Sequence, residues 1–154
     1  MALDFSIVMN VRHQFGGDDL NEGAYAGNRG SYAFDCPDVD TNAEAILLFQ
    51  SKGVGKEQSL EINGTRVYGG VPVTDSVVAR ALWGPVEANN HDHLVEAASR
   101  AWSGNVMLVG AGTLRTLGNE LEIASDGEHF LVDNVVVIFR TESGSLGPRD
   151  VLAE

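Results

Sequence analysis

Short stretches of alternating or continuous apolar residues, separated by turns, dominate the chain. Phe5, Ile7, Met9 and Val11 follow a two-residue period, which predicts an opening strand. Further strands are expected wherever apolar stretches lie between glycine-rich or acidic turns. These expected strands cover residues 31–34, 43–50, 59–63, 65–68, 105–109, 120–124 and 130–140. The pattern therefore predicts an all-β fold, an antiparallel β-sandwich or jelly roll of seven or eight short strands.

The best-defined turn lies in the stretch LEINGTRVYGG, residues 60–70. Asn63 and Gly64 both tolerate positive φ, so this pair favours a two-residue primed turn between antiparallel strands. Gly69 and Gly70 then allow the chain to leave the returning strand. We therefore expect a tight hairpin at this point of the sandwich.

Two segments depart from the strand pattern. Residues 13–30 contain several glycine, aspartate and asparagine residues, which predicts a long loop. Residues 71–102 carry apolar side chains at helical spacing after Thr74 and again after Asn89 or Asn90, which predicts an insertion with two short helices. We expect one domain over residues 1–142 and a flexible tail at residues 143–154.

The chain is strongly acidic, with a formal net charge of −12 over 154 residues. Such a charge repels nucleic acid and anionic membrane surfaces, so neither is an expected partner. No apolar run reaches the ~18–20 residues that a membrane-spanning helix needs. The N-terminus lacks the basic and apolar regions of a secretory signal, which predicts an intracellular protein or a chain that begins at a mature boundary. Cys36 is the single cysteine, which excludes an intrachain disulfide.

The order of these segments resembles the galactose-binding-domain-like β-sandwich, most closely the accessory sugar-binding domain of family 2 glycosidases. The stretch LEING, residues 60–64, matches a strand that ends in Asn-Gly, and LGNEL, residues 117–121, matches the segment before a late strand. Asp133-Asn134-Val135 is similar to the Asp-Asn-Val in the last strand of related carbohydrate-binding modules. The resemblance covers about two-thirds of the chain, departs at residues 71–102, and fixes function less closely than fold.

The resemblance implies a carbohydrate site, and sugar sites combine aromatic faces with short planar polar groups. Tyr68 and Trp83 lie beside glycine or proline in expected loops, which makes them candidate stacking residues. Arg29, Asn89 and Asn90 are candidate hydrogen-bonding residues. The alternative is that the aromatic side chains belong to the core and the polar ones are ordinary loop residues.

The resemblance also implies a structural calcium ion shared between an early loop and the last strand. Asp18 and Asp19 supply carboxylates in the glycine-rich loop, and Asp133 supplies one in the late strand. Calcium requires six to eight oxygen ligands of this kind. The alternative is that the acidic residues only keep the protein soluble.

These observations favour a non-catalytic, lectin-like domain that binds a glycan or small sugar, alone or as a homo-oligomer. The rival interpretation is a structural or assembly protein that uses the same sandwich for protein contacts. In that case Val77, Val78, Leu82 and residues 97–102 are the expected interface. An enzyme ranks third, because the sequence holds no nucleophile-elbow, P-loop or zinc-protease motif.

Overall fold

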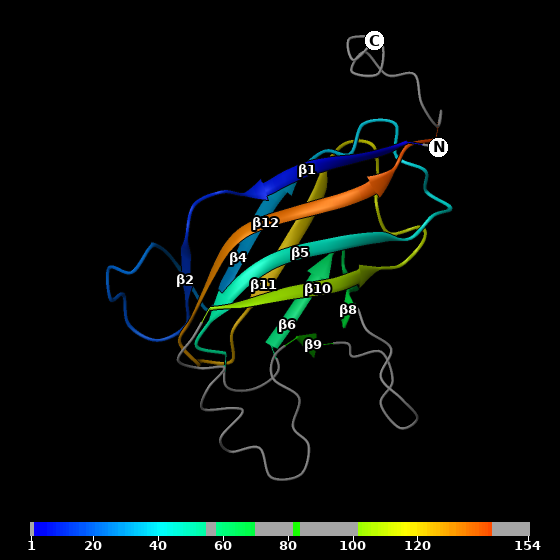
Figure 1. Ribbon diagram of the computed structural model, residues 1–154. Coiled ribbons are helices and arrows are strands. Elements are labelled where there is room, and N and C mark those ends of the chain that lie inside the picture. The colour runs from blue at the N-terminus through cyan, green and yellow to red at the C-terminus, as the bar shows by residue number, and fades with distance from the viewer. Residues whose placement is uncertain (1, 55–57, 70–81, 84–101, 143–154) are drawn as a thin grey trace.

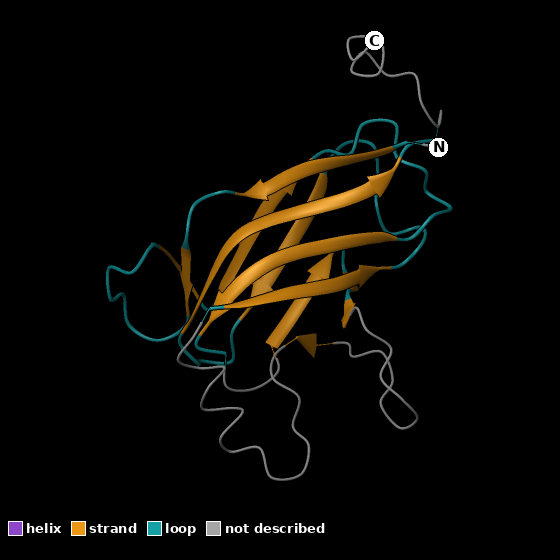
Figure 2. Cartoon of the chain, viewed as in Figure 1, coloured by secondary structure: helices purple, strands orange, loops and turns teal. Residues whose placement is uncertain are grey.

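The chain folds into two β-sheets that pack face to face (Figures 1 and 2). The computed structural model describes residues 2–54, 58–69, 82–83 and 102–142. Within those residues all regular secondary structure is β-strand. The prediction of an all-β fold is therefore confirmed, and the arrangement is β-sandwich-like.

The first sheet has seven strands in the order β3-β2-β12-β5-β10-β8, with β1 also beside β12. β12 is long enough to pair with β2 at one end and with β1 at the other. All pairs are antiparallel except β2 with β3. The strands are β1 (Leu3–Met9), β2 (His13–Phe15), β3 (Ala24–Gly27), β5 (Ala45–Lys52), β8 (Tyr68–Gly69), β10 (Ser103–Val109) and β12 (Phe130–Arg140).

The second sheet has five strands in the order β4-β11-β6-β7, with β9 also beside β6. Figure 1 shows β4, β11 and β6 behind β12, β5 and β10 and crossing them obliquely. The strands are β4 (Arg29–Phe34), β6 (Gln58–Ile62), β7 (Thr65–Arg66), β9 (Leu82–Trp83) and β11 (Asn119–Ala124).

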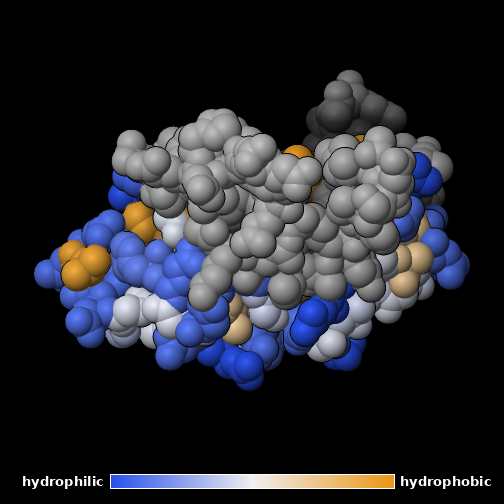
Figure 3. Space-filling view, turned by 90° about the horizontal axis from the view of Figure 1, so that it is seen from below, coloured by the Kyte–Doolittle hydropathy of each residue, from blue (hydrophilic) through white to orange (hydrophobic). Residues whose placement is uncertain are grey.

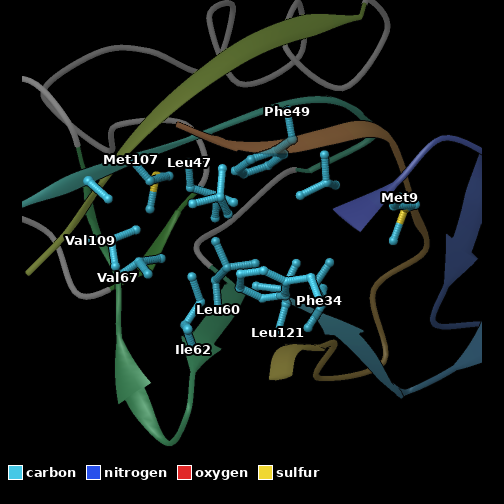
Figure 4. Packing of buried hydrophobic residues seen from close by; sticks show 14 of the residues in the cluster. Met9, Phe34, Leu47, Phe49, Leu60, Ile62, Val67, Met107, Val109 and Leu121 are labelled. Atoms are coloured by element: carbon cyan, nitrogen blue, oxygen red, sulfur yellow. The ribbon is translucent and has the colours of Figure 1, made fainter. Parts of the chain in front are cut away.

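One hydrophobic core fills the space between the sheets (Figure 4). Leu47 and Phe49 enter it from β5, and Leu60, Ile62 and Leu121 enter it from the second sheet. Each of these side chains is at most 3% exposed. Full burial of one such side chain stabilises the fold by about 1.5–3 kcal/mol. The alternation of inward and outward positions thus holds the sheets together and leaves every second side chain outside.

The predicted loop over residues 13–30 contains two short strands, β2 and β3, so the loop prediction was wrong there. Phe15 is fully buried and stacks on Phe130, with ring centroids 5.3 Å apart. β2 pairs with β12, far along the chain, and with β3. Short strands held by distant partners leave little local periodicity, and the glycines around them indicate a loop.

Most of the predicted insertion lies outside the described residues, as does the predicted tail at residues 143–154. The structure describes Leu82 and Trp83 within it as β9, a two-residue strand paired with β6. Leu82 is therefore in a strand and not on the face of the first predicted helix. The two helices themselves stay a prediction.

The Asn63-Gly64 hairpin is confirmed. Both residues have positive φ, 52° and 80°, and Ile62 pairs directly with Thr65 across the turn. The Asn63 side chain also fixes neighbouring chain segments, because its Nδ2 donates to the Thr113 carbonyl at 2.7 Å. The turn is therefore tied to the loop before β11 as well as to its own strands.

We expect Gly64→Val to lower the free energy of unfolding by about 1–2 kcal/mol, because a β-branched residue is strained at positive φ. An ideal Cβ at Gly64 meets no atom within 4 Å, so backbone strain alone sets the loss. Urea denaturation measures it. Thr65→Val places the same side chain at the exposed neighbouring position and is the control; equal midpoints for the two variants would contradict the strained turn.

Candidate functional site

The outward side of β1, β12, β5 and β10, called here the outer face, is unusually apolar. Cross-strand pairing aligns its side chains into continuous rows. The first row is Phe5, Ile138, Ile46 and Leu108, and the second is Ile7, Val136, Leu48 and Val106. By contrast, the side of the molecule seen in Figure 3 is mainly hydrophilic where its residues are described, with only small hydrophobic spots.

A bulge explains why the apolar positions of β1 face outward. Asp4, Ser6 and Val8 are partly buried on the inner side, and the Ser6 hydroxyl donates to the Asp35 carbonyl. Phe5 and Ile7 are therefore 55% and 58% exposed. The register of β1 against β12 shifts between Ile7 and Met9. This bulge turns the Met9 side chain into the core, although Met9 follows Ile7 by two residues.

A groove of about 550 Å³ lies on the outer face beyond the second apolar row. Asn134 lies in it at a register shift of β12, with φ of 52°. Its Nδ2 donates to Gln50 Oε1 at 2.9 Å, so two amide groups lie side by side. Gly104 leaves room, because an ideal Cβ there meets no atom within 4 Å. The lining residues are Leu48, Phe49, Gln50, Gly104, Asn105, Val106, Asn134 and Val136.

Charged and aromatic side chains gather next to the amide groups. Asp133 pairs with Gln50, and Gln50 pairs with Gly104, so a third, polar row follows the two apolar ones. Arg12 Nε lies 3.9 Å from Asp133 Oδ2, and its guanidinium carbon lies 4.8 Å from the Trp102 ring centroid. Trp102 is 37% exposed. We call Arg12, Gln50, Trp102, Asp133 and Asn134 the polar end of the outer face.

This arrangement is suited to binding. An indole offers an apolar face, while the guanidinium, the carboxylate and the amides offer planar hydrogen-bonding groups. Asp133 lies beside Arg12, and the described lining of the groove and polar end contains no histidine, thiol or second carboxylate. Cys36 is fully buried elsewhere in the core, and burial raises the pKa of its thiol to about 11, which keeps it protonated and unreactive near neutral pH.

The sugar-binding residues predicted from the sequence do not gather at this groove in the described structure. Arg29 begins β4 of the second sheet, and its Nη1 lies 3.6 Å from Glu122 Oε1. Tyr68 lies in β8 opposite Leu108, and Trp83 lies in β9 opposite Gln58, so these aromatics occupy short strands of different sheets. Asn89 and Asn90 lie outside the described residues. A ligand-binding role for these residues stays a prediction.

The three predicted calcium ligands occupy two different settings. Asp133 lies beside Arg12, whereas Asp18 and Asp19 lie in the loop between β2 and β3. The inner side of that loop binds the buried Gln14 amide, which donates to the Asp18 carbonyl at 2.6 Å and accepts from the Leu20 amide at 3.0 Å. Among the residues described, no three acidic, histidine or cysteine side chains form a metal-binding group. Calcium binding stays a prediction.

Comparison with known proteins adds no family. No protein-family model matches the chain, and no curated protein matches it. The described residues include no helix long and apolar enough to cross a membrane.

Proposed function

We propose that this chain is a non-catalytic carbohydrate-binding domain that holds a sugar at the polar end of the outer face. The observation that carries the proposal is the gathering of Trp102, Arg12, Asp133 and two amides beside one groove. A volume of about 550 Å³ suits a small ligand. The resemblance to the galactose-binding-domain-like sandwich supports the same function, and that family's jelly-roll strand order is part of the proposal.

The groups present match the two sides of a sugar ring. Trp102 offers its indole to the C–H side of the ring. Asp133 and Gln50 accept hydrogen bonds from hydroxyl groups, and Arg12 donates to ring or hydroxyl oxygens. Gln50, Asp133 and Asn134 lie in β5 and β12, so strand register fixes their positions. Arg12 and Trp102 directly precede β2 and β10.

We expect Trp102→Ala to weaken sugar binding at least tenfold, equivalent to about 1.4 kcal/mol. The melting temperature should change little, because the side chain is partly exposed. A glycan array identifies the sugar bound by the wild-type protein, and calorimetry then compares the variants. Trp102→Phe keeps a ring and should retain part of the affinity.

Tyr25→Ala is the control, because it removes an aromatic residue that is 45% exposed in β3, outside the polar end. It should leave the affinity unchanged. Asp133→Asn and Gln50→Ala test the hydrogen-bonding groups separately from the ring. Failure of the wild-type protein to bind any sugar, or equal binding by Trp102→Ala, would rule out this site.

A further inference from the structure

We propose that a second copy of this chain docks on the apolar rows of the outer face and forms a two-fold symmetric dimer. This inference rests on the apolar rows and not on the proposed sugar-binding function. The first row, Phe5, Ile138, Ile46 and Leu108, lies away from the groove. The second row also forms the apolar wall of the groove, so this row alone belongs to both the dimer contact and the sugar site.

The exposed area is sufficient for such a contact. Leu3 is 67% exposed, Phe5 55%, Ile7 58%, Ile46 39% and Val106 50%. Together with the partly buried members of the rows they present roughly 600 Å² of apolar surface, given the area of large side chains. The largest apolar patch on a typical monomer is about 300–600 Å². With the flanking polar residues the face approaches the ~800 Å² per partner of a standard interface.

The register makes the rows symmetric about a line between β12 and β5. A two-fold axis along this line places Phe5 over Leu108 of the second copy. The same axis places Ile138 over Ile46 and matches the two central strands to each other. Aligned face-to-face packing of two sheets is a common arrangement, and it brings the outward side chains of both sheets into one layer. The face is therefore complementary to itself, which a symmetric dimer requires.

The charges at the end of the rows fit the same symmetry. Arg140 ends β12, and Glu44 directly precedes β5. Both line a pocket of about 300 Å³ next to the first row. The axis brings Arg140 of each copy close to Glu44 of the other copy. The dimer therefore gains two ion pairs, one on each side of the axis. No charged residue lies within the two apolar rows. Two chains of net charge −12 therefore meet through rows that carry no charge themselves.

The mass of the protein in solution tests the proposal. Sedimentation velocity from 1 to 100 µM should show a concentration-dependent dimer for the wild-type chain. Ile46→Glu puts two carboxylates beside the axis and should weaken the dimer at least a hundredfold. Leu117→Glu is the control, because it adds the same charge at a residue that is 67% exposed in the segment between β10 and β11. It should leave the mass unchanged.

A charge exchange tests the symmetry itself. Arg140→Glu and Glu44→Arg should each weaken the dimer, and the double variant should recover most of the lost affinity. Circular dichroism establishes that each variant folds, and the exposed Arg140→Glu decides the matter if Ile46→Glu does not fold. Trp102→Ala should keep the mass of the wild type, which separates this proposal from sugar binding. A wild-type monomer at 100 µM, or a charge exchange without recovery, would overturn the dimer.

Discussion

Replacing Gly16 with alanine is expected to lower the free energy of unfolding by about 3 kcal/mol, because two costs coincide there. Gly16 has φ of 70°, which an alanine adopts only with strain. An ideal Cβ at this position would lie 2.0 Å from the Glu128 carbonyl oxygen, a backbone atom with little freedom to move. Thermal unfolding should show a melting temperature lower by roughly 6–12 °C for a chain of this length.

Gly118→Ala is the matched control, because Gly118 has nearly the same φ, 71°, and an ideal Cβ there meets no atom within 4 Å. Its free energy of unfolding should fall by about 1 kcal/mol, which is the cost of the backbone strain alone. The difference between the two variants then measures the contact of Gly16 with the turn between β11 and β12. Equal losses would mean that this contact is looser than the structure shows.

Strand positions were largely predictable because most strands carry their own periodicity. β5, β6, β11 and β12 lie within a residue or two of their predicted bounds, and the hairpin follows from the conformational preference of Asn63 and Gly64 alone. β2 was missed because its partner β12 is distant in sequence. β3 was missed because it pairs with β2 across a glycine-rich loop. The alternation of apolar and polar residues also predicts which side chains share a face of a strand. It does not predict which of the two faces points into the core. Phe5 and Ile7 show this, since their apolar phase faces outward.

The candidate site was harder to predict for a related reason. Arg12, Trp102 and Asp133 come from three separate parts of the chain, and only the pairing of the strands brings them to one end of the outer face. Asp133 belongs to a motif singled out from the sequence, but its neighbours depend on a register shift in β12 that no local pattern reveals. The outward position of Gln50 was a further signal, because Gln50 alternates with Phe49 in an apolar strand.

The second large effect is expected at Asn119, a polar residue that is only 1% exposed. Its Oδ1 accepts from the Arg115 amide at 2.7 Å and from Asn63 Nδ2 at 2.9 Å, and its Nδ2 donates to the Arg115 carbonyl at 2.7 Å. Asn119→Leu removes these three hydrogen bonds. The partly buried Arg115 amide and carbonyl and the Asn63 side-chain amide then lose a partner. We expect the free energy of unfolding to fall by about 4 kcal/mol in urea denaturation, since each such group costs about 1–3 kcal/mol.

Asn28→Leu makes the same exchange at an exposed residue between β3 and β4 and should cost far less. A similar loss in both variants would show that the hydrogen bonds of Asn119 contribute little. Such a result would also mean that the asparagine of the LGNEL stretch, residues 117–121, is not needed to hold this region together. In the structure, the Asn119 side chain connects the loop before β11 to Asn63 in the hairpin.

Asn119→Asp separates hydrogen bonding from shape, because it keeps the size of the side chain and changes only one donor. When ionised, the introduced carboxylate has no proton for the Arg115 carbonyl, and burial raises its pKa above the unfolded value of about 3.9. The folded state then binds the proton more tightly than the unfolded state, so the stability of the variant falls as pH rises through this range. Relative to wild type at each pH, the loss should be small near about pH 4 and largest above the raised pKa, where it levels off. Asn119→Leu has no such group, so its loss should not follow this curve; a pH-independent loss for Asn119→Asp would show that the buried amide does not donate to Arg115.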